Sequence, residues 1–331
     1  MPALPGALPA SRGFSLLELL ISMVVLTIVM GALMQFMGML QQRYTREQRA
    51  AGASQTGKTV LELLAMDTGQ AGYLGGGETT TTANITADPA AQPAILVNLN
   101  NIFNNIYVNR VLIVDLNQPG ALLLQENVRV QSVDAGAGTV TALFKLSHAP
   151  GTYVRISDAP YPQGILYSTA TDATNVAYTS NSTRLRILGE LWGDGNLRFV
   201  EYIHTFGADC TGRITRSDSP ALVNTVNAPV VVAENVCNDP SGTPPISPVF
   251  SYPGAGPMGT FTYVPEVVVN VIVQTQRSSV EEVGSGGPRR IAMRQSFAPR
   301  NVLWARRMAQ DGLADLLPTP PPTLPGPITV P

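Results

Sequence analysis

Hydrophobic residues form one long block near the start of the chain. Residues 14–40 carry a single formal charge, that of Glu18. As an α-helix with a rise of about 1.5 Å per residue, this block is about 40 Å long, which is enough to cross a bilayer with some tilt. The pattern predicts a membrane-spanning helix over residues 14–40, in which the carboxylate of Glu18 is costly to bury and needs a reason to be there.

A second, amphipathic pattern follows the apolar block. Residues 41–67 are rich in Gln, Arg, Glu and Ala, and apolar or small residues recur among them at helical spacing. These residues are Ala53, Gly57, Val60, Leu61 and Leu64. We therefore expect an amphipathic helix over residues 41–74 that packs this stripe on a globular domain, with the glycines between 69 and 77 ending it.

Short apolar and alternating runs then predict a β-rich domain over residues 75–311. It begins with a linker at 75–92, has a looped region at 158–182, and turns at Gly193-Asp194-Gly195, a strong hairpin signal. A Pro-rich tail at 312–331 is expected to be extended. The predicted strands are 94–99, 106–116, 121–125, 128–133, 139–146, 153–156, 184–191, 196–205, 267–276 and 290–297.

The clearest strand pair is the last one. Valines alternate with polar residues along 267–276, and Ile291, Met293 and Phe297 alternate with polar residues along 290–297. The pair therefore forms a closing hairpin with one apolar face, which suits it to lie on the amphipathic helix.

Composition narrows the classes of function. The net charge of −2 gives no whole-chain field that would attract nucleic acid. The two cysteines, Cys210 and Cys237, predict one disulfide if this region lies in an oxidising compartment. The alternative, a metal site built on the same two thiols, lacks a CxxC spacing and a nearby histidine, so no metal is expected.

Catalytic signals are weak. His148 and His204 are the only histidines, and the chain has neither an HExxH motif nor a nucleophile elbow. We expect no enzymatic activity and no cofactor, and a packed or surface role for each histidine.

One nucleotide-binding motif needs a separate interpretation. Residues 52–59, GASQTGKT, match the P-loop pattern GxxxxGK[ST], and residues 111–115 could supply the strand and the acid that hold magnesium. A P-loop needs a buried strand before its glycine-rich turn, and the polar residues before Gly52 cannot form one. A membrane-anchored P-loop protein therefore remains a distant alternative.

The residues around the start of the apolar block resemble the class III leader of type IV pilins and pseudopilins. Arg12-Gly13 precedes Phe14, and Glu18 is the fifth residue after that break. The resemblance implies a leader over residues 1–13 that prepilin peptidase cuts between Gly13 and Phe14, followed by N-methylation of Phe14. It also implies that Glu18 pairs with the free amine of a neighbouring subunit during assembly.

The same resemblance implies an α+β, pilin-like fold, in which a long amino-terminal helix packs on a β-rich globular head. Its first half would lie in the membrane or the filament core. Charge alone suggests the reverse orientation, because Arg43, Arg46 and Arg49 follow the helix and only Arg12 precedes it. We follow the leader motif, which implies a single-pass inner-membrane protein with its head in the periplasm and, after assembly, a place in a cell-surface pilus.

A shorter run is similar to the PilW subgroup of minor pilins. Gln70-Ala-Gly-Tyr73-x-Gly75 follows the amphipathic helix, although the Arg before and the Cys after it in that subgroup are missing here. The similarity implies a minor pilin that primes pilus assembly and works with other minor and major pilins and the inner-membrane assembly platform. A J-type minor pseudopilin of a type II secretion system is the alternative. Tyr73 is expected to pack into the head, and twitching motility, adhesion and DNA uptake (competence) stay open as roles.

Arginines gather near the end of the predicted head, with Trp304 among them. They are Arg289, Arg290, Arg294, Arg300, Arg306 and Arg307. Arginine with an aromatic residue suits contact with phosphate and bases, so Arg300, Arg306 and Arg307 are candidate contacts for DNA or another partner. We favour the simpler interpretation, a solvated hairpin face followed by a short polar helix.

Overall fold

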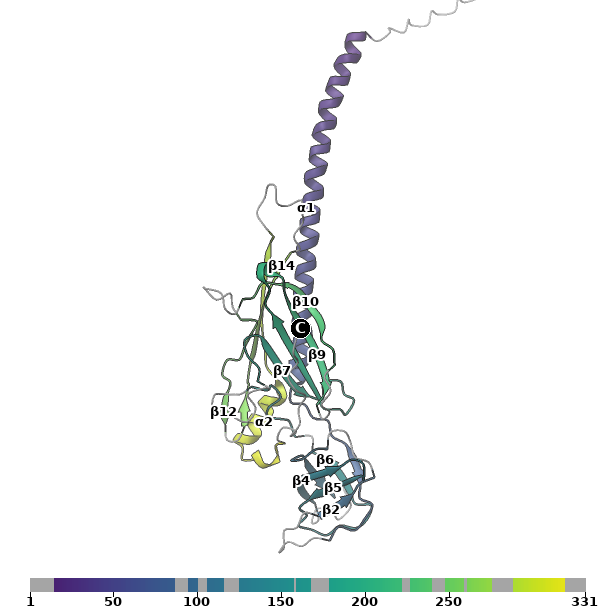
Figure 1. The fold of residues 1–331 in the computed structure, drawn as a ribbon, viewed down its shortest axis with the longest axis vertical. Helices are drawn as coiled ribbons and strands as arrows, with labels where there is room; N and C mark the ends of the chain where they lie inside the picture. The colour runs from purple at the N-terminus through teal and green to yellow at the C-terminus, as the bar shows by residue number, and fades with distance from the viewer. Residues whose placement is uncertain are drawn as a thin grey trace, which may run out of the picture. The chain divides into compact units, whose positions relative to one another are not determined.

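The computed structural model describes residues 15–86, 95–100, 106–115, 125–157, 159–167, 179–221, 227–239, 248–258, 261–275 and 288–318. The chain divides into two compact units, Met1–Gly52 and Ala53–Pro331. Helix α1, Leu16–Gln70, supplies most of the first unit and enters the second (Figure 1). A long helix followed by antiparallel sheets is the α+β, pilin-like fold expected from the sequence.

Helix α1 ends four residues earlier than the predicted position 74. Gly72 has a φ of 76°, which a helix cannot continue through. Its N–H donates to the carbonyl of Leu188 at 2.9 Å, and its own carbonyl accepts from the N–H of Tyr161 at 2.7 Å. At Gly72 the backbone therefore pairs with the head, while the N–H groups of Ala71 and Tyr73 still donate to carbonyls of the last helical turn.

The second unit is built from two main sheets, a two-stranded ribbon and a short helix, α2, Arg300–Gln310. The strands are β1 Glu78–Thr80, β2 Ile95–Asn98, β3 Val111–Val114, β4 Glu126–Asp134, β5 Thr139–Ala142, β6 Tyr153–Ile156, β7 Arg184–Gly189, β8 Arg198–Thr205, β9 Gly212–Pro220, β10 Val230–Val236, β11 Phe250–Ser251, β12 Gly256–Met258, β13 Phe261–Tyr263, β14 Val267–Gln274 and β15 Arg290–Phe297. Two 3₁₀ turns complete the described elements, η3 Ala208–Cys210 and η5 Ala314–Leu316.

The first sheet closes into a small barrel, whose strands lie close together in Figure 1. Its order is β1-β6-β3-β4-β5-β2, and a bridge between Thr81 and Leu99 joins the two outermost strands. Two backbone hydrogen bonds support this closure, from Thr82 N to Asn98 O at 2.9 Å and from Asn100 N to Thr80 O at 3.1 Å. Closure leaves no long free edge. The buried core of this barrel is Ile85, Leu99, Ile106, Leu112, Val114, Val128, Val130, Val140, Ala142, Phe144, Val154 and Ile156.

The second sheet receives the end of α1. Its order is β11-β14-β10-β9-β8-β7, with β15 paired to β14 over the full length of both strands. The five stripe residues predicted from the sequence are all buried in α1 (Ala53, Gly57, Val60, Leu61 and Leu64). Four of them share a hydrophobic cluster with the inner valines of β14, and Ile291 and Met293 of β15 pack against it. The predicted closing hairpin and its packing on the helix are thus confirmed.

Other expectations are corrected. The predicted linker at 75–92 contains strand β1, and the predicted strand 106–116 is limited to β3. The predicted Pro-rich tail does not begin at 312, because η5 is a 3₁₀ turn and Leu317 is fully buried beside Tyr263 and Val302. Arg129 of the barrel also donates to the carbonyl of Asp315. Most of the predicted strand 121–125, and the tail from residue 319, lie outside the described residues.

Cys210 and Cys237 form a disulfide, the pairing expected for an oxidising compartment. It joins η3, which precedes β9, to the end of β10. The bond encloses β9 and β10 in one covalent loop.

Candidate functional site

The candidate site is the amino-terminal part of α1. Its first turn begins at the carbonyl of Ser15, which accepts hydrogen bonds from the N–H groups of Glu18 at 3.0 Å and Leu19 at 3.1 Å. Glu18 lies exposed in this turn, where a negative charge is favourable with the helix dipole. Gly13 and Phe14, the predicted cleavage and methylation positions, lie outside the described residues.

The helix surface that follows is apolar and uncovered. α1 is long and apolar enough to cross a membrane, and its most apolar stretch is not buried at all within the chain. Leu16, Leu26 and Phe36 are 83%, 60% and 55% exposed. An apolar surface of this extent requires lipid or another apolar protein surface to cover it.

The Ser and Thr hydroxyls of this segment donate hydrogen bonds within the helix. The hydroxyl of Ser22 donates to the carbonyl of Glu18 and that of Thr27 to the carbonyl of Met23, each at 2.7 Å. Such internal bonds are what a helix in lipid needs, because no water is available there. Glu18 is the one charged residue among residues 16–40. This part of the helix therefore contains no cation that could neutralise its carboxylate.

The P-loop pattern is part of the same helix. Residues 52–59 are all helical, so their N–H groups serve the helix and do not cradle a phosphate. Packing explains the glycine at position 57 instead, because a Cβ there would overlap the end of the Met293 side chain. The structure thus argues against the nucleotide-binding alternative.

The three arginines proposed as DNA or partner contacts do not share one surface. Arg300 and Arg307 are exposed on α2, one on either side of Trp304 along the helix, whereas Arg306 is half-buried. Burial raises the pKa of the Tyr263 phenol, and the charge of the nearby Arg306 opposes this shift in part. Arg290 and Arg294 point outward from β15. The six arginines therefore follow two consecutive elements and do not form a compact patch.

Tyr73 is also placed differently from the prediction. Its side chain is 45% exposed instead of packed into the head. Its backbone is held instead, because its carbonyl accepts from the N–H of Glu190 at 2.8 Å and its N–H donates to the carbonyl of Gln70 at 2.9 Å. In the Gln70–Gly75 run, Ala71 and Leu74 are the buried hydrophobic residues.

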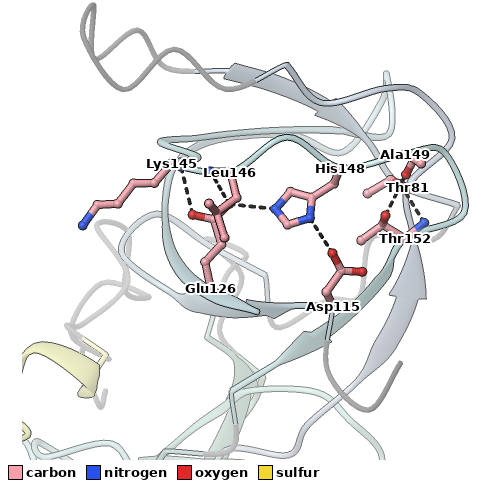
Figure 2. A network of polar contacts seen from close by, with 8 residues as sticks. All are labelled: Thr81, Asp115, Glu126, Lys145, Leu146, His148, Ala149 and Thr152. Atoms are coloured by element: carbon pink, nitrogen blue, oxygen red, sulfur yellow. Dashed lines mark hydrogen bonds and ion pairs between the residues drawn. The ribbon is translucent and has the colours of Figure 1, made fainter. Parts of the chain in front are cut away.

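The barrel contains a buried polar network that was not predicted from the sequence (Figure 2). Nδ1 of His148 lies 2.6 Å from Oδ2 of Asp115, and Nε2 lies 2.8 Å from Oε1 of Glu126. Glu126 also accepts the backbone N–H groups of Lys145 and Leu146 at 2.9 and 3.2 Å. Both ring nitrogens of the imidazole are therefore engaged.

This network favours a structural role. Asp115 follows β3, Glu126 begins β4, and His148 precedes β6, so the imidazole links three segments of the barrel. Among the described residues, no group of three or more His, Cys, Asp or Glu side chains is arranged to hold a metal ion. Asp115, Glu126 and His148 are far apart in the sequence and form no recognisable motif, so their contacts could not be predicted from it.

The comparisons with known proteins agree with the leader. Residues 8–34 match the prokaryotic N-terminal methylation motif. This match supports a type IV pilin-like or pseudopilin protein that prepilin peptidase processes, and it fits membrane anchoring by α1. The matched residues end at 34, so the match includes no residue of the β-rich head. No curated protein and no solved structure matches the chain.

Proposed function

We propose that this chain is a minor pilin of PilW type that primes the assembly of a type IV pilus. The observation that carries the proposal is the N-terminal methylation motif at residues 8–34, placed on a helix whose apolar surface no described part of the chain covers. The function is structural: α1 supplies a membrane anchor before assembly and a core helix afterwards. The Gln70–Gly75 run supports the PilW type over other minor pilins.

Glu18 is the assembly residue in this proposal. A single carboxylate in an apolar segment is stabilised by a cation that it meets inside the assembly. The free amine of a processed Phe14 on a neighbouring subunit is such a cation, and pairing the two charges fixes the axial position of one helix against the next.

The proposal sets the order of events. Prepilin peptidase removes residues 1–13, Phe14 is N-methylated, and the chain waits in the inner membrane with its head in the periplasm. The assembly platform then joins it to other minor and major pilins. The Cys210–Cys237 disulfide is consistent with an oxidising periplasm.

The first test is mass spectrometry of the protein purified from its native host. The expected amino terminus is an N-methylated Phe14. A mature protein that begins at any other residue would contradict the processing and, with it, the pilin assignment.

The second test separates assembly from insertion. Glu18→Ala is expected to insert and lose its leader normally but to be absent from sheared filaments. Glu62→Ala, which removes another exposed carboxylate of α1, is the matched control and should enter filaments normally. Filament levels of Glu18→Ala equal to those of the control would refute the role of Glu18.

A further inference from the structure

Helix α2 is firmly mounted on the head by one side. Val302 and Ala305 are 1% and 0% exposed, in a cluster with Tyr263 and Leu317. Asn301 donates its side-chain N–H to the carbonyl of Ala71 at 3.4 Å. The helix therefore has a fixed orientation on the head, and its opposite side is held outward.

That opposite side, the α2 outer face, combines apolar and basic residues. Its members are three or four residues apart, which places them on one side of a helix. They are Arg300, Leu303, Trp304 and Arg307. Trp304 is 64% exposed and Leu303 is 37% exposed, so two large apolar side chains protrude between two arginines.

Basic residues predominate around this face. Residues 288–310 contain six arginines and no Asp or Glu, and the acidic residue that follows them, Asp311, pairs with Arg307 at 3.3 Å, so Arg300 is the arginine of the face with no acidic partner among the described residues. Arg300 lies in the first turn of α2, where a positive charge opposes the helix dipole and no acidic residue is present. Helix stability therefore does not explain the presence of Arg300 in this turn.

We propose that the α2 outer face docks on the surface of an anionic phospholipid bilayer. Trp304 and Leu303 enter the boundary between headgroups and acyl chains, where the amphipathic indole is most favourable. Arg300 and Arg307 contact the lipid phosphates, with their aliphatic stems along the apolar surface. This surface has the composition of an interfacial helix, with a basic rim and a Trp/Leu centre.

A single-stranded nucleic acid fits this face less well. Sequence-tolerant binding of single strands uses a basic groove with several aromatic platforms for successive bases. Here the surface is the outside of one helix, a single aromatic ring is exposed on it, and its neighbour is the aliphatic Leu303. Leu303 adds to insertion into lipid and has no plane on which a base can stack.

The proposal goes beyond pilus assembly and does not depend on leader cleavage or on Glu18. It is tested on the full chain held in nanodiscs of phosphatidylcholine, to which separate vesicles are added. One vesicle preparation is phosphatidylcholine alone and the other contains phosphatidylglycerol as well. Trp192→Phe is the background, because the chain has two tryptophans and Trp304 then reports alone.

The expected result is a blue shift of Trp304 fluorescence and co-sedimentation with the phosphatidylglycerol vesicles only, weakened by salt. Arg300→Gln and Arg307→Gln should each weaken binding about fivefold, the effect of one basic residue at an anionic surface. Lys145→Gln, which removes an exposed charge from the barrel, is the matched control and should change nothing.

Two outcomes would overturn the proposal. One is a failure to bind phosphatidylglycerol vesicles, or equal binding to both preparations, by a protein with unchanged circular dichroism. The other is saturable binding of a single-stranded oligonucleotide, sensitive to Arg300→Gln, without lipid binding, which would assign the face to nucleic acid. Trp304→Ala provides a second check, since it should abolish vesicle binding while the buried side of α2 stays intact.

Discussion

Arg216 on β9 donates its Nε–H to Oδ2 of Asp67 on α1 across 2.9 Å. The hydroxyl of Tyr202 on β8 donates to the same oxygen at 2.6 Å. Asp67 is only 1% exposed, so the last turns of α1 are tied to the second sheet by a buried charge. Burial first, and the negative charge of Asp67 second, raise the pKa of Tyr202, which keeps this phenol a donor.

Asp67→Ala is expected to lower the free energy of unfolding of the head by about 3 kcal/mol, because it leaves a cation and a phenol without their acceptor. Arg216 keeps its second partner, Asp218, at 2.9 Å, which limits the loss. Asp311→Ala is the control, since it breaks the exposed ion pair with Arg307 and should cost at most about 0.5 kcal/mol. Urea unfolding in detergent micelles measures both, and equal effects would refute a special role for Asp67.

Gly72→Ala is expected to destabilise the head by about 2 kcal/mol or more. Gly72 has a φ of 76°, which costs an L-residue about 1–2 kcal/mol. A Cβ there would also lie 2.5 Å from the backbone carbonyl oxygen of Tyr161, which cannot easily move. The position therefore resists even the smallest side chain.

Gly69→Ala, three residues earlier, should do the opposite. Gly69 is helical, and a Cβ there meets no atom within 4 Å. Alanine should therefore stabilise this turn of α1 by about 0.5–1 kcal/mol. Thermal unfolding of both variants gives the comparison, and a destabilised Gly69→Ala would contradict the account of how α1 ends.

The sequence predicted the elements whose pattern is local. The apolar block and the stripe from Ala53 to Leu64 identified α1, because helical spacing can be read directly from the chain. The alternation in β14 and β15 identified the hairpin for the same reason. The strands β9 to β13 were not predicted, and neither was β1, a three-residue strand whose neighbours, β6 and Leu99, are distant in sequence. Barrel closure depends on such long-range pairs, which no local pattern encodes.

The candidate site divides in the same way. Glu18 could be found because it interrupts an apolar block, and the leader was a motif of adjacent residues. The contacts of His148 with Asp115 and Glu126 could not be found, because each acid follows or begins a different strand. The prediction that Tyr73 packs into the head was wrong, because its backbone carbonyl, and not its ring, makes the contact with the head.

His148→Leu is expected to lower the stability of the barrel by about 3 kcal/mol. The side chain of His148 is 0% exposed and those of Asp115 and Glu126 are 11% and 9% exposed, so removal of the imidazole leaves two poorly hydrated carboxylates facing one apolar group. Hydrogen exchange of the amides of β3, β4 and β6 should quicken more than that of β8 and β9.

Adding Asp115→Asn to His148→Leu provides the control. It removes one of the two negative charges, so the double variant should regain part of the lost stability, and the two effects should not add. Additive losses would show that His148 acts by packing alone, for instance through its edge-on contact with Phe144 at 6.1 Å between ring centroids.

Acid should weaken the second sheet through His204. This side chain is 4% exposed, and neither ring nitrogen has a hydrogen-bond partner among the described residues. Burial lowers the pKa of His204 from 6.5 to about 4, and the charge of Asp239 opposes that shift only in part. Between these two pKa values the unfolded chain binds a proton that the folded chain does not. The contribution of His204 to the free energy of unfolding is therefore complete above pH 6.5 and falls as the pH drops toward about 4. The slope is at most about 1.4 kcal/mol per pH unit. His204→Gln should remove this part of the slope in urea unfolding followed across that range, whereas an unchanged slope would assign the acid sensitivity to other groups.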